Sequence, residues 1–190
     1  GPAGAGKSSV SKAVAKSLGY TYIDTGAMYR AVALFAINNG IDAKNETEKL
    51  VSRLNEVEID IKYTDEGQQI YLLGENVSKR IREEDVSVGA SNVAVIPEVR
   101  KKLVELQRKM AESAIVIMDG RDICSYVLPN ADVKVYLTAS VECRAMRRFK
   151  ELEGKGEACD FEQIRQDIQE RDERDMTREI APLKQAEDAT

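Results

Sequence analysis

The first eight residues, GPAGAGKS, have the residue types and spacing of a P-loop, which binds nucleotide phosphates. Glycines let successive backbone N–H groups turn towards phosphate oxygens, where a Cβ would block the approach. Lys7 is placed to reach the β- and γ-phosphates, and the Ser8 hydroxyl to hold Mg²⁺. A flexible glycine and alanine turn before a helix is the weaker interpretation, because every fixed position of the motif is filled. The predicted ATP-binding residues are Gly1, Pro2, Ala3, Gly4, Ala5, Gly6, Lys7, Ser8 and Ser9.

A second candidate for metal chemistry is Asp119, which follows the apolar run AIVIM at residues 114–118. An aspartate at the carboxyl end of a buried strand is where a P-loop enzyme places the carboxylate that holds Mg²⁺. Such an aspartate is often only a helix cap. Because Ser8 is also present, we favour the metal role and predict Ser8 and Asp119 as metal ligands.

Arginines are the third group of candidate functional residues, because a planar guanidinium pairs with two phosphate oxygens at once. The segment ERDERDMTR at residues 170–178 repeats arginine every three or four positions, which predicts that they line one helical face. A solvated helix with surface ion pairs is the usual alternative for such a run, and composition alone does not decide. The candidates are Arg30, Arg121, Arg147, Arg148, Arg171, Arg174 and Arg178.

Length and composition limit the class of protein. The chain has 190 residues, which suits one domain with a small insertion, and 43% hydrophobic with 32% charged residues is ordinary for an α/β protein. Its net charge of −5 argues against binding nucleic acid, and no apolar run is long enough to cross a membrane. Three cysteines without C-x-x-C spacing predict reduced thiols in a cytoplasmic protein. The absence of histidine argues against a zinc site and against Ser-His or Cys-His catalysis.

The elements that must position these residues follow an alternating order. We expect a helix over 9–18, a strand over 20–24, a helix over 27–38, a short helix over 47–55 and buried strands over 114–118 and 133–137. Helices are also predicted from about 83, over 97–112, from Ser140 to about 152, and over 161–173. This order predicts an α/β fold, a P-loop three-layer sandwich with a parallel sheet.

One segment interrupts the parallel pattern. Residues 57–63 alternate apolar and polar side chains, residues 65–67 form a turn signal, and residues 69–73 again favour a strand. We therefore expect a small antiparallel insertion. The predicted domains are a core at 1–56 and 114–190, with a lid within about 144–178, and an insertion at 57–113.

Four motifs together resemble bacterial cytidylate kinases, a family of P-loop nucleoside-monophosphate kinases. They are GPAGAGKS, DTGAMYR at 24–30, DGRD at 119–122 and ERDERDMTR at 170–178, and the resemblance spans essentially the whole chain. It implies that the insertion binds the nucleoside monophosphate and that a helical lid closes over the phosphates. It also implies ATP and CMP or dCMP as partners, Mg²⁺ as cofactor and a monomer.

Residue roles implied by the resemblance fall on matching positions. Those that bind the acceptor nucleotide are Thr25, Tyr29, Arg30, Ser91, Arg100, Arg121, Asp122, Arg171, Asp175 and Arg178, and the catalytic residues are Lys7, Arg121, Arg174 and Arg178. Ser91, Arg100 and Asp122 would read the cytosine ring, whose edge offers an amino donor and two acceptors. Arg171 and Asp175 would recognise the ribose hydroxyls.

The sequence departs from the family at two places. Cys124 and Ser125 stand where the family has glycine and threonine, so a backbone that needs positive φ would be strained at Cys124. The chain also begins at the P-loop, without the strand that normally precedes it, and lacks the last strand and helix. We expect a truncated chain.

The function predicted from these observations is transfer of the γ-phosphoryl group of Mg·ATP to CMP or dCMP, giving ADP and CDP or dCDP. The acceptor phosphate is already anionic, so no general base is needed. A P-loop kinase for UMP or AMP, or a nucleotide-binding protein without turnover, stays open. A GTPase is disfavoured because the chain has no N-K-x-D motif.

Overall fold

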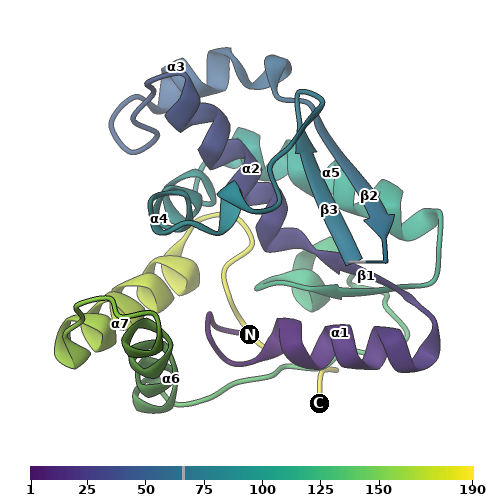
Figure 1. Ribbon diagram of the computed structural model, residues 1–190. Helices are drawn as coiled ribbons and strands as arrows, with labels where there is room; N and C mark the ends of the chain where they lie inside the picture. Colours follow the sequence, from purple (N-terminus) through teal and green to yellow (C-terminus); the bar gives the residue numbers. More distant parts are fainter. Residues whose placement is uncertain (66) are drawn as a thin grey trace. The chain divides into compact units, whose positions relative to one another are not determined.

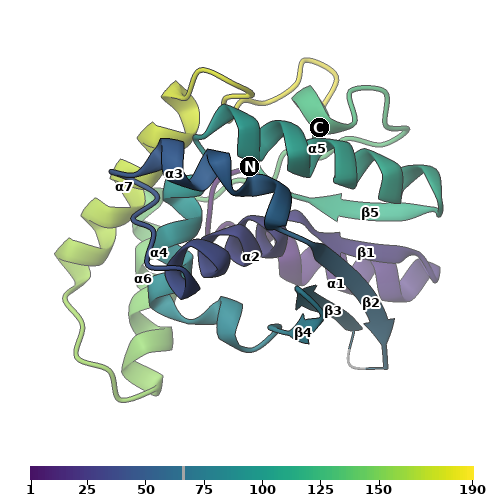
Figure 2. The ribbon, with the colours of Figure 1, turned by 90° about the horizontal axis from the view of Figure 1, so that it is seen from above.

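The computed structural model describes residues 1–65 and 67–190 and divides them into two compact units (Figures 1 and 2). The first unit contains residues 1–14 and 120–190, and the second contains residues 15–119. The division falls within helix α1 (Lys7–Leu18). Glu66, in the predicted turn at 65–67, lies outside the described residues.

The second unit contains the parallel pair of strands that the sequence predicts. Strand β1 (Thr21–Asp24) pairs with β5 (Val116–Asp119) in parallel, and the register places Asp24 opposite Asp119. Both aspartates therefore end their strands at the same edge, where α/β proteins place ligands. Helix α2 (Thr25–Asn38) follows β1 directly, and α3 (Thr47–Ser52) and a 3₁₀ turn (Leu54–Glu56) come next.

The predicted antiparallel insertion is also present in this unit. Strand β2 (Ile59–Thr64) pairs with β3 (Gly67–Leu72), which pairs with β4 (Glu75–Asn76). A 3₁₀ turn (Arg80–Arg82), α4 (Glu84–Val93) and α5 (Pro97–Glu112) complete it. Pro97 begins α5 because its missing N–H costs no hydrogen bond at a first helical position. The α/β class with a separate antiparallel sheet is thus confirmed.

Helix α2 has well-defined ends. The Asp24 carboxylate accepts a hydrogen bond from Ala27 N at 3.0 Å and caps the first turn. At the other end Gly40 has a φ of 61°, Gly40 N donates to Ile37 O and Ile41 N donates to Ala36 O. This pattern is a Schellman cap, which requires a residue tolerant of positive φ. The caps fix the residues at which α2 begins and ends.

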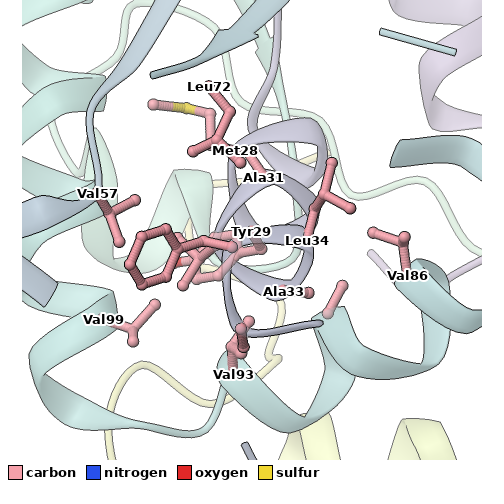
Figure 3. Close-up of a cluster of buried hydrophobic side chains, with 14 of the residues drawn as sticks. Met28, Tyr29, Ala31, Ala33, Leu34, Val57, Leu72, Val86, Val93 and Val99 are labelled. Carbon is pink, nitrogen blue, oxygen red and sulfur yellow. The ribbon is translucent and has the colours of Figure 1, made fainter. Parts of the chain in front are cut away.

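The core of the second unit forms around α2 (Figure 3). Met28 and Leu34 on α2 are at most 2% exposed, and side chains from the insertion, α4 and α5 pack around the helix. Each such side chain contributes about 1.5–3 kcal/mol when it leaves water. Because α2 is buried on most of its surface, the residues at its N-terminus are held firmly in place.

The first unit is built largely from two packed helices. Helix α6 (Val141–Gly154) begins at Ser140, whose hydroxyl accepts from Cys143 N at 3.2 Å, as predicted. Helix α7 (Phe161–Thr177) begins at Asp160, which caps Gln163 N at 2.7 Å. The two helices pack against each other (Figure 1). A short π-helical segment, Ile123–Val127, lies between the DGRD motif and α6.

Two strand predictions need correction. Residues 133–137 form no strand with another segment of the described chain; their backbone is held through Thr190, which donates to Lys134 O and accepts from Tyr136 N. Val133 is 80% exposed, so apolar composition here does not mark burial. The strand at 114–118 is present as β5, but Ile115 is 67% exposed because, among the described residues, β5 pairs only with β1. None of the described helices is long and apolar enough to cross a membrane.

The turn between β3 and β4 provides a stability prediction. Leu73 and Gly74 have φ values of 51° and 81°, which are the two positive values of a type I′ turn. A leucine in the left-handed region costs about 1 kcal/mol, and its exposed side chain gains little in return. We expect Leu73→Asn to raise the free energy of unfolding by about 0.5–1 kcal/mol, measured by urea denaturation. Leu73→Ala is the control, and an equal gain from it would contradict the role of backbone strain.

An exposed ion pair at the start of α4 gives a pH prediction. The Arg80 guanidinium donates to both oxygens of Asp85, at 2.7 and 2.6 Å, and lowers the pKa of Asp85 to about 2. Because the folded pKa lies below the unfolded value of about 4, the stabilisation is present above pH 4 and disappears as the pH falls through 2. An NMR titration of Asp85 should therefore give a midpoint near 2. Arg80→Ala should return that midpoint to about 4.

Candidate functional site

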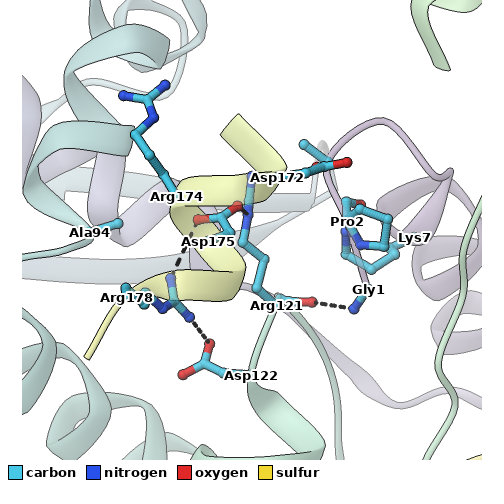
Figure 4. Close-up of polar contacts among 12 residues, drawn as sticks. Gly1, Pro2, Lys7, Ala94, Arg121, Asp122, Asp172, Arg174, Asp175 and Arg178 are labelled. Carbon is cyan, nitrogen blue, oxygen red and sulfur yellow. Dashed lines mark hydrogen bonds and ion pairs between the residues drawn. The ribbon is translucent and has the colours of Figure 1, made fainter. Parts of the chain in front are cut away.

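The P-loop in the first unit has the backbone that phosphate binding requires. Gly4 and Gly6 have φ values of 73° and 97°, a region that side chains disfavour, so glycine is needed at both positions. The Lys7 ammonium folds back and donates to Pro2 O at 2.6 Å (Figure 4). Lys7 and Ser8 begin α1, so the positive end of the helix dipole lies at the loop. The loop can thus bind an anion through backbone N–H groups and one ammonium.

Four predicted substrate-binding residues form one ionic network in this unit (Figure 4). Arg121 Nε donates to Asp175 Oδ2. Arg178 lies between two carboxylates, with Nη1 3.5 Å from Asp175 Oδ1 and Nη2 3.5 Å from Asp122 Oδ1. The Arg178 side chain is 3% exposed. Two arginines and two aspartates drawn from the DGRD and ERDERDMTR motifs are therefore adjacent, although the motifs lie about fifty positions apart in the sequence.

The arginines of ERDERDMTR do not share one helical face as predicted. Helix α7 ends at Thr177, and Arg178 continues in an extended conformation, with φ −61° and ψ 144°. Its Nε donates to Ala181 O at 2.8 Å, and Ala181 has a φ of 51°, so the chain turns back here. Arg174 stays exposed on α7 while Arg178 is buried. Arg171 also lies on α7 and is half-buried. The alternative interpretation, a solvated helix with surface ion pairs, therefore fits the beginning of α7 but not its end.

In the second unit, the DTGAMYR motif forms the junction between β1 and α2. Arg30 Nη2 donates to Asp24 Oδ2 at 3.2 Å, and the exposed Arg82 lies 3.7 Å from the same oxygen. The Thr25 hydroxyl donates to Asp119 O at 2.7 Å and joins α2 to the end of β5. A Cβ at Gly26 would lie 3.2 Å from Asp24 Oδ1, which is tight enough to disturb this arrangement. The motif therefore places arginine and hydroxyl groups together at the strand ends.

Two of the three residues expected to read the base, Ser91 and Arg100, lie in the second unit, whereas Asp122 belongs to the first. The Arg100 guanidinium lies over the Tyr29 ring, 5.6 Å from its centroid, and donates to Ala94 O at 3.0 Å. Arg100 is 1% exposed and is held between α2 and the end of α4. Ser91 is half-buried on α4. Burial fixes the position of the Arg100 side chain, as expected of a residue that recognises one ligand edge.

The predicted metal ligands have suitable chemistry. The Asp119 carboxylate accepts a hydrogen bond from the Tyr22 hydroxyl at 2.9 Å, which orients it, and Ser8 is exposed in the first turn of α1. Carboxylate and hydroxyl oxygens are the hard ligands that Mg²⁺ prefers. Within residues 1–65 and 67–190 no three histidine, cysteine or acidic side chains form a metal cluster. Ser8 belongs to the first unit and Asp119 to the second.

Cys124 does not carry the backbone strain that its position suggested. It lies in the π-helical segment Ile123–Val127, and the non-glycine residues with positive φ in the described chain are Leu73 and Ala181. A residue with a Cβ is therefore compatible with this backbone.

The buried pair of Arg144 on α6 and Asp172 on α7 is absent from the predicted set. Their atoms Nη2 and Oδ2 are 2.5 Å apart, and neither side chain is more than 7% exposed. Both residues lie in helices dense with charge, and no local signal separates them from their exposed neighbours.

Comparison with known proteins gives a consistent result. The family model for cytidylate kinase matches residues 1–190. Over 189 residues the chain is 52% identical to a cytidylate kinase of Caldicellulosiruptor bescii, covering all of this chain and 83% of that protein. It is 50% identical to that of Exiguobacterium over 189 residues, with 100% and 84% coverage. Against that of Streptococcus agalactiae it is 47% identical over 190 residues, with 100% and 83% coverage.

Proposed function

The chain belongs to the cytidylate kinase family, and from this premise we propose that it transfers the γ-phosphoryl group of ATP to CMP or dCMP. The products are ADP and CDP or dCDP. The observation that carries the assignment of residues is the network of Arg121, Asp122, Asp175 and Arg178, which lies in the same unit as the P-loop.

The donor phosphates are assigned to the P-loop. The N–H groups at Gly4 to Ser9 and the Lys7 ammonium offset the negative charge of the β- and γ-phosphates. Lys7 must leave Pro2 O to do so, and the fold supplies that backbone oxygen as its resting partner. Ser8 and Asp119 would hold Mg²⁺, which neutralises charge on the transferred phosphoryl group.

The acceptor nucleotide is assigned to the residues that the resemblance implies. Arg121 and Arg178, with Arg30, bind the acceptor phosphate, and Asp175 with Arg171 binds the ribose hydroxyls. The network supports this because each arginine already pairs with a planar carboxylate, whose two oxygens resemble those of a phosphate. Thr25 and Tyr29 bind beside Arg30, and Ser91, Arg100 and Asp122 read the cytosine. Arg174 acts on the transferred phosphoryl group from the lid.

The reaction needs positioning and charge neutralisation more than proton transfer. The nucleophile is a phosphate oxygen of CMP, already anionic near neutral pH, so no base has to remove a proton. Removal of water by the lid, within residues 144–178, would suppress hydrolysis of ATP. We further assign residues 57–113 to a monophosphate-binding domain and the remainder to the core. The free cysteines fit a cytoplasmic enzyme, and the family resemblance is the basis for proposing a monomer.

Product analysis tests this proposal. A ³¹P NMR time course of the chain with Mg·ATP and CMP should show ADP and CDP increasing in equal amounts. Formation of ADP without CDP would indicate an ATPase. Binding of ATP without either product would indicate a nucleotide-binding protein, and both outcomes would contradict the proposal.

Asp122 gives a prediction about the base. Its carboxylate is 6% exposed and would accept from the amino group of cytosine, whereas uracil presents an oxygen there. We expect Asp122→Ala to lower the ratio of kcat/KM for CMP to that for UMP about tenfold or more. Asp167→Ala removes an exposed carboxylate of α7 and is the matched control. An unchanged ratio in Asp122→Ala would refute the assignment of this residue to the base.

A further inference from the structure

Arg144 is a buried cation of the first unit whose guanidinium has several hydrogen-bond partners. Its residue is 3% exposed, and its guanidinium makes four hydrogen bonds. Nε donates to Ala139 O at 2.9 Å, and Nη1 donates to Ala3 O at 3.1 Å. Nη1 and Nη2 donate to the two oxygens of Asp172 at 3.1 and 2.5 Å. One side chain thus joins the P-loop, the start of α6 and helix α7.

The bond to Ala3 O fixes the orientation of a P-loop peptide. A peptide unit is planar and trans, so its C=O and N–H groups point in opposite directions. When Arg144 binds Ala3 O on one side of the loop, Gly4 N–H is directed to the other side. Arg147 lies three residues further along α6. Its Nη1 donates to Gly4 O at 3.3 Å, which orients Ala5 N–H in the same way. The carbonyls of Ala3 and Gly4 therefore face α6, and the N–H groups of Gly4 and Ala5 face away from it.

Close packing supports the same arrangement. A Cβ at Gly4 would lie 3.5 Å from Arg144 Cβ, which is ordinary contact, so the loop already rests on this side chain. The loop is rich in glycine and has little stiffness of its own. A rigid partner outside the loop is therefore needed to keep its N–H groups in one orientation before the nucleotide arrives.

Asp172 gives Arg144 that rigidity. Its carboxylate is 7% exposed and accepts two parallel hydrogen bonds, which leave the guanidinium one orientation. Asp172 precedes Asp175 by one turn of α7, so the same helix holds the Arg144 pair and the Arg121–Asp175 network.

We propose that Arg144, held by Asp172, is a positioning residue that orients the P-loop N–H groups for the donor phosphates. This inference rests on the proposed function in taking ATP as the ligand of the loop. Arg144 itself does not touch the nucleotide; it acts through Ala3 O from the outer side of the loop.

Two variants of Arg144 test the proposal. Arg144→Lys keeps the charge next to Asp172 but cannot reproduce the planar fork to Ala3, Ala139 and Asp172. The double variant Arg144→Met/Asp172→Leu removes the pair without leaving a buried charge behind. Arg165→Met removes a partly exposed arginine of α7, which pairs with Glu162 at 2.9 Å, and is the matched control.

The readouts are the Kd of Mg·ATP by calorimetry, the KM of CMP at saturating ATP and the midpoint of urea unfolding. We expect the Kd to rise about tenfold or more in the double variant and about threefold or more in Arg144→Lys. Arg165→Met should stay within twofold of wild type, and the KM of CMP should change little in Arg144→Lys. A merely structural pair would lower the urea midpoint but leave the Kd of folded protein unchanged.

The proposal is overturned if Arg144→Lys binds Mg·ATP as tightly as wild type, whether or not the double variant folds. Calorimetry separates this inference from the proposed function. A wild-type chain that binds Mg·ATP but does not phosphorylate CMP would refute the function, and the comparison of Kd values would still decide the role of Arg144. A wild-type chain that does not bind Mg·ATP would refute both.

Discussion

Replacing Arg121 with alanine is expected to lower kcat for CMP about 10²- to 10³-fold, the typical loss for one donor to a developing anion. Arg121 Nε is held by Asp175, so its planar fork is already oriented, and alanine removes this oriented donor from the acceptor phosphate. The measurement is the steady-state rate of ADP formation at saturating Mg·ATP and CMP.

The fold should survive this change because Asp175 remains paired with Arg178. Urea denaturation of the variant checks this, and Arg165→Ala serves as an activity control with the same loss of charge. A kcat within threefold of wild type in a folded Arg121→Ala chain would rule out the assigned catalytic role.

Removing Arg178 is expected to have the largest effect on stability. Its guanidinium is 3% exposed and pairs with Asp122 and Asp175, whose side chains are 8% and 7% exposed. Arg178→Ala would leave both carboxylates buried beside each other with less compensation. We expect a loss of about 3–5 kcal/mol in the free energy of unfolding.

Arg174→Ala is the matched control for this prediction, because Arg174 lies one turn earlier on α7 and is exposed. Its stability should change by no more than about 0.5 kcal/mol. Equal losses in the two variants, measured by urea unfolding, would show that the network does not stabilise the end of α7.

Local signals allowed much of the fold to be predicted. Pro97 at a first helical position and the Ser140 cap each depend on neighbouring residues alone, and both helices begin where expected. Helix α2 begins at Thr25, two residues before the start expected at 27, because the Asp24 carboxylate caps it. Strands depend on partners instead, so β propensity at residues 133–137 could not establish a strand.

The site also has features that local sequence signals predict and features that depend on tertiary packing. Glycines with positive φ and the acidic and basic residues of the motifs could be identified from spacing. Which charged side chains are buried could not be identified from spacing. Arg144 and Arg174 both lie in helices of similar composition, and only tertiary packing buries the first and leaves the second exposed. The turn at Ala181 was also hidden, since a positive φ there would be expected of glycine or asparagine.

The most direct test of the account is kcat/KM for CMP, dCMP, UMP and AMP with Mg·ATP as donor, measured on the 190-residue chain. We expect CMP or dCMP to exceed UMP and AMP at least tenfold, because Asp122 and Arg100 match the cytosine edge. Equal rates with UMP or AMP would contradict the assigned base recognition. Absence of transfer to any acceptor would contradict the central claim that this chain phosphorylates CMP or dCMP.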